Sequence, residues 1–472
     1  MFIGREMEIR QLRALRRDVE PRIAVLYGRR RVGKTELIHE AFKNETALFF
    51  EGLEGQGKQS QILNFLFQLK QQVPDLEMSN KIRDWPAALM LLVPILKNRP
   101  AVIVLDELQW MASQRSELIV NLKMVWDQYI SKISGVSLIL CGSIASFMID
   151  QVVKSKALYG RVEVVIGLTP FNLSEASQML TSHGEMEVLE SLLLLGGIPL
   201  YLKLVRNHPS IYLGINELAF RPNGFFVTEF DRIFLSHFGK KDHYAKIVNA
   251  LHRNSYGLFR EEISKICKIE LSGHLSKELE DLELAGFIKS HVPIDKQQTS
   301  KIKKYILTDP YLRFYLTMIQ PSIRQMGTEK ADLFLQITQT PQFFSFLGQA
   351  FELFCQNNSF LISKILGFQG INYTAGPYFR KDLKSSGTQI DLLFDRQDNV
   401  VTLCEIKYSR NPIGKEVISE VEKKVEILSS VFSKKKTIQK VLIVKDRVTK
   451  DLDQAHYFYK IIRCEDLFNG IS

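Results

Sequence analysis

Two groups of residues in this sequence have the types and spacing that phosphate chemistry requires. The first is Gly28, followed after four residues by Gly33, Lys34 and Thr35, between the apolar run IAVLY and the helical pattern ELIHEAF. Glycines let backbone N–H groups turn toward phosphates, the lysine can reach the β- and γ-phosphates, and the hydroxyl can hold Mg²⁺. The pattern predicts a strand, a loop that binds ATP and Mg²⁺, and a helix. The candidate nucleotide-binding residues of this loop are Gly28, Arg29, Arg30, Arg31, Val32, Gly33, Lys34, Thr35 and Glu36.

An acidic strand end supplies the partner that such a loop needs. Residues 101–107 read AVIVLDE, which predicts a buried strand that ends in Asp106 and Glu107. In this position Asp106 would hold the Mg²⁺ shell, and Glu107 would polarise the attacking water. A further apolar run, VSLILCGS, ends at Ser143, which is either a sensor of the γ-phosphate or an ordinary turn serine.

The second group lies in TQIDLLFDRQDNVVTLCEIKYS, residues 388–409. The stretches QIDLLFD and VVTLCEIK predict antiparallel strands joined at 396–399, which places Asp391 opposite or nearly opposite Glu405. Lys407 shares the face of Glu405, because side chains alternate along a strand. Two carboxylates this close can hold Mg²⁺ or Mn²⁺, and the lysine can activate water or stabilise a charged transition state. The stretch therefore predicts either a metal site that cuts phosphodiesters or a hairpin that happens to carry acids.

Both faces of this hairpin are largely apolar, which an exposed hairpin would not need. Alternation puts Leu393 and Leu403 on the acidic face. The opposite face receives Ile390, Leu392, Cys404 and Ile406. The pattern predicts a covered sheet with the charged site at one end.

Between these two groups, residues 243–308 show three short helical patterns and then two strands around a basic turn, the order of a winged helix-turn-helix. Its third helix would expose Ser272, His274, Ser276 and Lys277, and its wing carries Lys296, Lys301, Lys303 and Lys304. Such a helix can enter a major groove while the lysines meet phosphates. The acids Glu278, Glu280, Asp281 and Glu283 would repel DNA unless they face away. Lone histidines such as His274 are expected to be surface groups and not metal ligands.

The opening FIGRE, the loop GRRRVGKT, the strand VIVLDE and GGIPLYL at 196–202 together resemble the archaeal-type ATPases of the STAND branch of the AAA+ class. The resemblance implies that Gly4, Arg5 and Pro199 flank the nucleotide base. It also offers Arg161 as an arginine that faces the phosphates, and an exposed salt-bridging arginine is the alternative. In such ATPases the winged helix often packs against the nucleotide domain as a switch element, so DNA contact by this module stays open.

The stretch Asp391…Glu405-Ile406-Lys407 resembles the PD-(D/E)xK nuclease superfamily, with Ile390 where a proline is common. The resemblance implies a preceding helix that contributes another acid, and GQAFELFCQNN offers Glu352 for this role. It implies metal ligation by Glu352, Asp391 and Glu405. One group of archaeal-type ATPases carries a nuclease-like C-terminal domain, so the two resemblances support each other.

Length and composition fit a multidomain globular protein. The chain has 472 residues, of which 45% are hydrophobic and 24% charged, and a net charge of +10 that suits a polyanionic partner such as DNA. There is no signal-peptide pattern, no apolar run of a membrane span's length and no paired cysteine spacing, which predicts a cytoplasmic protein with reduced thiols. The predicted domains are 1–205 (P-loop ATPase core), 206–240 (helical connector or lid), 241–320 (winged helix-turn-helix) and 321–472 (nuclease-like).

These patterns together predict an α/β protein in which a P-loop parallel sheet is followed by a winged helix and a restriction-endonuclease-like domain. The predicted function is ATP hydrolysis coupled to DNA binding and metal-dependent DNA cleavage, in DNA processing or defence. The rivals are a non-cutting switch that binds nucleic acid or a partner protein, and a chaperone-like ATPase, against which the basic charge and the Glu-x-Lys pattern argue. A nucleotide-dependent homo-oligomer remains open.

Overall fold

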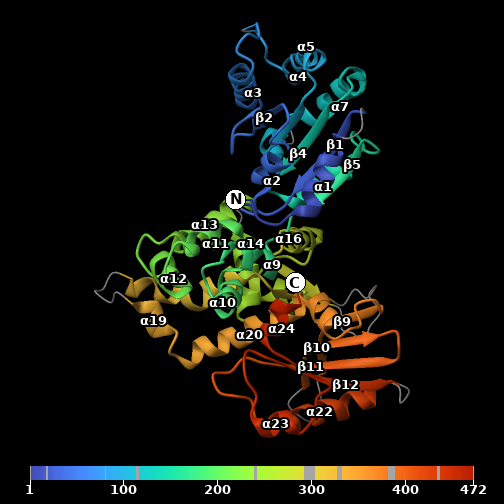
Figure 1. The fold of residues 1–472 in the computed structure, drawn as a ribbon. Helices are drawn as coiled ribbons and strands as arrows, with labels where there is room; N and C mark the ends of the chain where they lie inside the picture. The colour runs from blue at the N-terminus through green and yellow to red at the C-terminus, as the bar shows by residue number, and fades with distance from the viewer. Residues whose placement is uncertain are drawn as a thin grey trace. The chain divides into compact units, whose positions relative to one another are not determined.

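The chain folds into two compact units, which a computed structural model describes over most of their length (Figure 1). The described residues are 2–16, 20–79, 81–112, 116–238, 242–291, 303–326, 332–380, 388–432 and 436–470. The first unit is Met1–Pro170 with Glu280–Ala285, and the second is Phe171–Leu279 with Gly286–Ser472. The domain boundary that the sequence predicted at position 205 stays a prediction.

A five-stranded sheet forms the centre of the first unit, with the strand order β2-β3-β4-β1-β5 and all neighbours parallel. Its strands are β1 (Arg22–Tyr27), β2 (Ala47–Glu51), β3 (Val102–Asp106), β4 (Ser137–Gly142) and β5 (Val162–Gly167). Every residue of β3 and β4 is buried, as expected for parallel strands with both faces covered. The predicted α/β fold with a parallel sheet is confirmed.

Helices cover both faces of this sheet. They are α1 (Glu6–Ala14), α2 (Lys34–Ala41), α3 (Lys58–Gln72), α4 (Trp85–Met90), α5 (Leu92–Asn98), α6 (Leu108–Met111), α7 (Leu118–Gln128) and α8 (Ala145–Phe147). One face packs Ile103 and Leu105 of β3 against Phe65 of α3, Trp85 of α4 and Val125 of α7. Because side chains alternate along a strand, Val102 and Val104 are buried on the other face.

The second unit begins with a set of helices rich in aromatic contacts. Its helices before the C-terminal sheet include α9 (Leu173–Met179), α10 (Glu185–Leu195), α11 (Pro199–Arg206), α12 (Ile211–Ala219), α13 (Phe225–Phe238), α17 (Pro310–Phe314), α19 (Leu333–Ile337), α20 (Pro341–Asn357) and α21 (Ser359–Ile365). Helix α10 packs against α17 and α20, and α11 against α12. The ring of Tyr201 on α11 lies 5.5 Å from that of Tyr311 on α17. These apolar contacts explain why residues 171–205 belong to the second unit.

A smaller helical module belongs to the second unit except for Glu280–Ala285, which are part of the first. It contains α14 (Asp242–His252), α15 (Arg260–Cys267) and α16 (Gly273–Leu284), with a three-stranded antiparallel sheet in the order β6-β8-β7. The strands are β6 (Leu258–Phe259), β7 (Ile288–His291) and β8 (Lys304–Leu307). Lys296 and Lys301 of the predicted wing lie outside the described residues. The order of elements is the predicted one, and the winged-helix interpretation stays a prediction.

A mixed sheet in the order β13-β12-β11-β10-β9 carries the C-terminal acids (Figure 1). Its strands are β9 (Tyr373–Arg380), β10 (Thr388–Arg396), β11 (Val400–Lys407), β12 (Thr437–Val444) and β13 (Lys460–Ile462). Strands β10 and β11 form the predicted antiparallel pair, and β11 continues parallel to β12. Helix α20 contacts the sheet at β9, β10 and β11, and α22 (Glu416–Val431) contacts it at β10 and β12. The short helices α23 (Lys450–Gln454) and α24 (Cys464–Asn469) complete the unit.

One detail of the strand faces differs from simple alternation. Leu393 and Leu403 pack in a cluster with Val421 of α22, on the face where the sequence predicted them. Ile390 belongs to this same cluster, although alternation placed it on the opposite face. The reason is a shift in the pairing of β10 with β9 between Ile390 and Leu393, because an irregularity of this kind resets the alternation.

The described part of the chain contains no helix that is both long and apolar enough to cross a membrane. All five cysteines are free thiols, and Cys267 alone among them is not buried.

Candidate functional sites

The phosphate-loop candidate connects β1 to α2. Lys34 is the first residue of α2, and its ammonium donates to the carbonyl oxygens of Gly28 at 2.9 Å and of Arg29 at 3.2 Å. Gly33 has a φ of 89°, which a side chain would disfavour. A Cβ at Gly28 would lie 2.4 Å from the carbonyl oxygen of Leu168, so only glycine fits there. The loop thus folds its lysine back over its own backbone.

The remaining loop residues differ in exposure. Arg29 and Val32 are buried, Arg31 has a positive φ of 71°, and Thr35 and Glu36 are exposed at the start of α2. Arg30 forms an ion pair of 3.3 Å with Glu54. The loop therefore presents backbone, one lysine and one hydroxyl, and one of its arginines is engaged by an acid.

The acids at the end of β3 face the loop and the end of β4. Thr35 donates its hydroxyl to the Asp106 carboxylate at 2.7 Å, and the second Asp106 oxygen accepts from the backbone N–H of Glu107 at 2.8 Å. Ser143 donates to the Glu107 carboxylate at 2.7 Å, and Gln109 donates to both Glu107 and Ser143. The structure thus brings Lys34, Thr35, Asp106, Glu107 and Ser143 to one edge of the sheet.

Two residues here were missed by sequence reasoning. Gln109, two positions after Glu107, is buried and links that acid to Ser143. Glu51, at the end of β2, is paired in register with Asp106. Burial, together with the charges of Asp106 and Glu107, raises the pKa of Glu51 above its usual value. The sequence offered little indication of Glu51, because FFEG at the end of an apolar run is typical of an ordinary strand end.

The residues predicted to flank the base lie apart along the chain. Gly4 and Arg5 both have a φ of 60°, and the buried Arg5 guanidinium donates to the backbone carbonyl of Thr169. Pro199 begins α11 in the second unit, just after Gly197, whose hydrogen atoms lie against the backbone of Phe171. These positions stay predicted base contacts.

Arg161 is engaged in a salt bridge. Its guanidinium donates to both carboxylate oxygens of Asp127, at 2.6 and 2.8 Å. The hydrogen bond from Arg161 lowers the pKa of Asp127 below its usual value. Two parallel hydrogen bonds of this kind form a bidentate ion pair. This is the geometry of a salt-bridging arginine, which the sequence left open as the alternative to an arginine that faces the phosphates.

A second set of charged residues gathers where β10, β11 and α20 meet. The pairing of β10 with β11 ends at Leu392 and Cys404, and Asp391 and Glu405 are the next residues along the two strands. The backbone N–H of Ile406 donates to the Asp391 carboxylate at 3.1 Å, and both acids are buried. Glu352 of α20 lines the same hollow as Asp391, Glu405 and Lys407. The structure therefore brings all four predicted residues together.

Lysines balance part of this negative charge. Lys407 lies 3.1 Å from one oxygen of Glu405 and 2.7 Å from Glu420, and Lys424 forms an ion pair with the other oxygen of Glu405. Lys424 and Glu420 are on α22 and were missed from the sequence. Their spacing of four residues in EVEKK puts them on one helix face, yet nothing in the sequence tells which face covers β11.

Burial and crowding shift the pKa values of this set. Burial, reinforced by the charge of Asp391, raises the pKa of Glu352 to about 7. Burial also raises the pKa of Asp391 to about 6, with Glu405 adding to the rise and Lys424 opposing it. Burial by itself would lower the pKa of Lys407, but hydrogen bonds with Glu420 and Glu405 outweigh this effect and raise the pKa overall. The cluster holds more negative charge than its lysines neutralise, which is a setting in which carboxylates bind a divalent cation.

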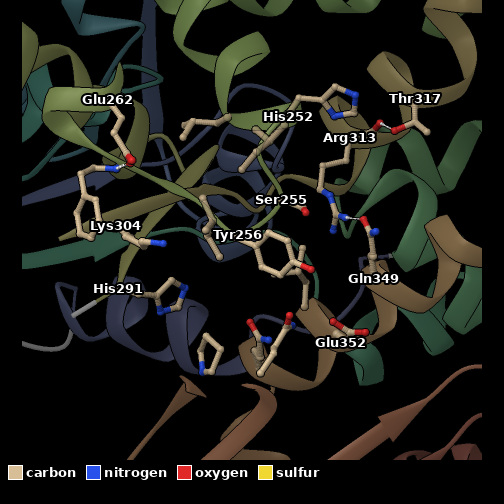
Figure 2. A pocket seen from close by; sticks show the side chains of 18 residues that line it. His252, Ser255, Tyr256, Glu262, His291, Lys304, Arg313, Thr317, Gln349 and Glu352 are labelled. Carbon is tan, nitrogen blue, oxygen red and sulfur yellow. Dashed lines mark hydrogen bonds between the residues drawn. The ribbon is translucent and has the colours of Figure 1, made fainter. Parts of the chain in front are cut away.

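A cavity of about 460 Å³ opens beside this cluster and shares Glu352 and Gln389 with it. Figure 2 shows Arg313, Tyr256 and Lys304 around this space, with Arg313 directed toward Gln349. Arg313 donates to Gln349 at 3.2 Å. Burial lowers the pKa of Arg313 to about 10, an effect that the charge of Glu352 only partly offsets. The cavity thus presents a poorly compensated cation next to the acids.

The parallel sheet and the loop between β1 and α2 have the arrangement of a P-loop α/β domain, and comparison with known proteins shows similarity to ATPase domains of this kind. Residues 2–205 match a family model described as an ATPase domain predominantly from Archaea. An uncharacterised protein of Methanocaldococcus jannaschii is 26% identical over 324 residues, which are 68% of this chain and 70% of the relative. The family match supports ATPase activity for the domain at 2–205.

Among solved structures, the chain is similar to a Walker-type ATPase of Pyrococcus abyssi, with 18% identity, a TM-score of 0.49, and coverage of 67% of this chain and 96% of that one. It is also similar to the Aeropyrum pernix ORC1 protein, solved in complex with DNA, with 14% identity, a TM-score of 0.38, and coverage of 69% and 93%.

Proposed function

We propose that the protein binds and hydrolyses ATP at the loop between β1 and α2, and that its nucleotide state controls DNA binding and metal-dependent DNA cleavage by its C-terminal sheet. Lys34 would hold the β- and γ-phosphates, and Thr35 with Asp106 would hold Mg²⁺. The residues fit this ion, because a hydroxyl and a carboxylate oxygen already lie 2.7 Å apart beside the loop. Bound Mg²⁺ would neutralise phosphate charge there.

Within this ATPase site, Glu107 would accept a proton from the attacking water and orient it. Ser143 and Gln109 both donate to Glu107, so they would fix the direction of its carboxylate. Ser143 at the end of β4 would then respond to the γ-phosphate by exchanging its hydrogen bond between Glu107 and the nucleotide. This keeps the predicted sensor role of Ser143 and would couple the γ-phosphate to Glu107, the proton acceptor.

The cleavage proposal depends on the convergence of Glu352, Asp391, Glu405 and Lys407 from α20, β10 and β11. The donor set fits a hard cation such as Mg²⁺ or Mn²⁺, because the three acids Glu352, Asp391 and Glu405 line one hollow. Burial is the main cause of the raised pKa values of Glu352 and Asp391, and a bound cation would favour their charged forms. The metal would supply Lewis-acid activation of water and phosphate. Lys407 would stabilise negative charge that develops on the scissile phosphate.

The neighbouring cavity supports a nucleic-acid substrate. Arg313 and Lys304 line it, and the ring of Tyr256 faces the same space, so a phosphate and a base each have a partner there (Figure 2). Aromatic rings and cations are the usual partners of an unpaired strand. We place the nucleotide next to the cleaved phosphate in this cavity, with the charge of +10 attracting DNA from solution.

The test is cleavage of DNA by the full-length protein. Single-stranded, blunt, overhanging, nicked and supercoiled substrates are incubated with Mg²⁺ or Mn²⁺, with and without ATP, and the fragments are resolved on gels. We expect metal-dependent cleavage of at least one form and a change in rate on adding ATP. Protein that hydrolyses ATP but cuts none of these substrates contradicts the cleavage proposal and leaves the ATPase proposal intact.

A non-cutting switch is the second candidate, and one observation favours it. Both oxygens of Glu405 are already paired, one with Lys407 and the other with Lys424. A carboxylate held in this way can serve as a purely structural ion pair, and the sheet would then bind DNA or a protein without chemistry. This candidate predicts DNA retention in binding assays with no metal-dependent fragments.

A further inference from the structure

Two histidines and a glutamate meet between two helices of the small module in the second unit. His243 is on α14, and His274 and Glu278 are four residues apart on α16 and therefore share one helix face. One oxygen of Glu278 lies 3.1 Å from Nδ1 of His243 and 3.3 Å from Nε2 of His274. One ligand atom from each residue lies within 4.8 Å of those of the other two.

The three side chains differ in their exposure to solvent. The Glu278 side chain is 1% exposed, whereas those of His243 and His274 are 43% and 61% exposed. The second carboxylate oxygen of Glu278 is buried and has no hydrogen-bond partner in the structure. A buried oxygen without a donor costs free energy, and a cation bound at the other oxygen of the same carboxylate offsets part of that cost through its charge. The two imidazoles are therefore open to solvent, and the carboxylate is covered.

The distances fit a tetrahedral ion. With metal–ligand bonds of about 2.0–2.1 Å, the ligand atoms around tetrahedral Zn²⁺ lie roughly 3.3–3.5 Å apart. The two oxygen–nitrogen distances are already close to this value, and only the two imidazoles must approach each other. Imidazole nitrogens select Zn²⁺ and related transition metals over Mg²⁺ or Ca²⁺.

We propose that His243, His274 and Glu278 form a site for a transition-metal dication, with Zn²⁺ the ion of choice and water as the fourth ligand. The ion ties α14 to the first turns of α16, the helix whose N-terminal residues were predicted to face DNA. Binding to the folded state alone stabilises that arrangement by mass action. The site is independent of the acid cluster around Asp391 and of the nucleotide loop.

Without a metal, the same contacts are two hydrogen bonds from imidazole N–H groups to one carboxylate oxygen. This alternative needs a proton on Nδ1 of His243 and on Nε2 of His274, whereas the metal site needs a lone pair on each. The two arrangements therefore differ in a measurable way, because only one of them takes up an ion.

The test uses tag-free, full-length, metal-stripped protein carrying Asp391→Ala, so that the acid cluster does not compete. Zn²⁺ is titrated against a chelating dye in excess Mg²⁺, and Co²⁺ is titrated with its visible absorption recorded. The variants His243→Ala, His274→Ala and Glu278→Gln are added singly. His252→Gln, which changes a histidine of α14 outside the cluster, is the matched control.

We expect one tightly bound Zn²⁺ in the parent and in His252→Gln, and Zn²⁺ affinity more than ~100-fold weaker in each cluster variant, since even residues that only touch a metal ligand cost ~10–100-fold. Bound Co²⁺ should give the intense absorption of a tetrahedral site. Equal Zn²⁺ binding in parent and cluster variants, or no binding by the parent, overturns the proposal. If Glu278→Gln unfolds, the outcome for His274→Ala decides, because that side chain is largely exposed.

Discussion

The two acid-bearing sites of this protein balance their charge in opposite ways. Asp106 and Glu107 at the end of β3 are held by a hydroxyl, a backbone N–H and a side-chain amide, none of which is charged. Glu405 in the C-terminal sheet is held by two ammonium groups, those of Lys407 and Lys424. In the first unit the cation that faces the acids is left to Mg²⁺, and in the second much of the positive charge beside the acids is built into the protein.

This difference has a consequence for what each site can do alone. Neutral donors to a carboxylate can be exchanged for Mg²⁺ without breaking an ion pair, so the first site is suited to repeated binding and release. Breaking a buried ion pair is costly, so the second site is suited to a fixed architecture in which a metal adds to Glu352, Asp391 and Glu405. The first site is therefore expected to depend on one lysine, and the second on several groups that act as a unit.

The largest expected effect is that of Lys34→Ala. Since Lys34 is the cation that reaches into the loop, its removal should lower ATP turnover by ~10²-fold or more and weaken nucleotide binding. Steady-state phosphate release and binding of a fluorescent nucleotide measure the two effects. Lys43→Ala is the control, because Lys43 is a largely exposed lysine of the same unit that pairs with Glu40. Wild-type turnover in Lys34→Ala contradicts the ATPase site.

The next effect concerns the C-terminal site. Asp391→Ala, Glu405→Ala and Lys407→Ala should each abolish Mg²⁺- or Mn²⁺-dependent cleavage while ATP turnover persists, because the metal and the lysine act together. Glu352→Ala should also weaken cleavage, because Glu352 lines the same hollow as the other acids. Lys423→Ala, an exposed neighbour of Lys424, should cut like the wild type. If these variants cut normally, the C-terminal sheet has a binding role and no part in cleavage.

Glu107→Gln tests the site in the first unit, where neutral donors hold the acids. The variant should keep nucleotide binding and lose ~10²-fold in turnover, because it removes the proton acceptor and leaves Asp106 for Mg²⁺. If Ser143 acts by orienting Glu107, adding Ser143→Ala to Glu107→Gln should cost no more than Glu107→Gln alone. Additive losses in this double-mutant cycle would give Ser143 a separate contact with the nucleotide.

The two sites also differ in how far the sequence predicted them. The phosphate loop is local, since Gly28 to Thr35 form one strand–loop–helix turn, and both the parallel sheet and the loop's partners could be inferred from apolar runs ending in polar residues. Asp391 and Glu405 were placed opposite each other for the same reason, because a short hairpin fixes its own register.

What the sequence could not predict are contacts between elements far apart. Lys424 reaches Glu405 only because α22 crosses that face of the sheet, and helix periodicity does not say which sheet a face covers. His243 and His274 are 31 positions apart, so His274 alone looked like a surface group. The bulge at Ile390 depends on the pairing with β9, which the hairpin itself does not reveal.

Ile406→Ala tests the architecture beside the acids and not the charges themselves. Ile406 is 4% exposed, so truncation should lower the free energy of unfolding by about 2–5 kcal/mol through lost burial and a cavity. Urea unfolding followed by circular dichroism measures this change. Cleavage at low temperature should survive in the folded fraction, in contrast to Asp391→Ala. A stability equal to that of the wild type would show that the neighbouring side chains refill the space.

Arg161→Ala should have the smallest effect. Its ion pair with Asp127 is roughly one-third exposed on both sides, and such pairs contribute about 0–1 kcal/mol. Because Arg161 lowers the pKa of Asp127, this contribution exists above the ordinary carboxyl pKa and disappears as the pH falls through the lowered value. The stability difference between wild type and variant should therefore disappear at acidic pH, as measured by urea unfolding across a pH series.

ATP turnover of Arg161→Ala at neutral pH should be unchanged, with Lys123→Ala as the control that removes another partner of Asp127. A large loss of turnover in Arg161→Ala alone would mean that the guanidinium leaves Asp127 for the phosphates when nucleotide binds.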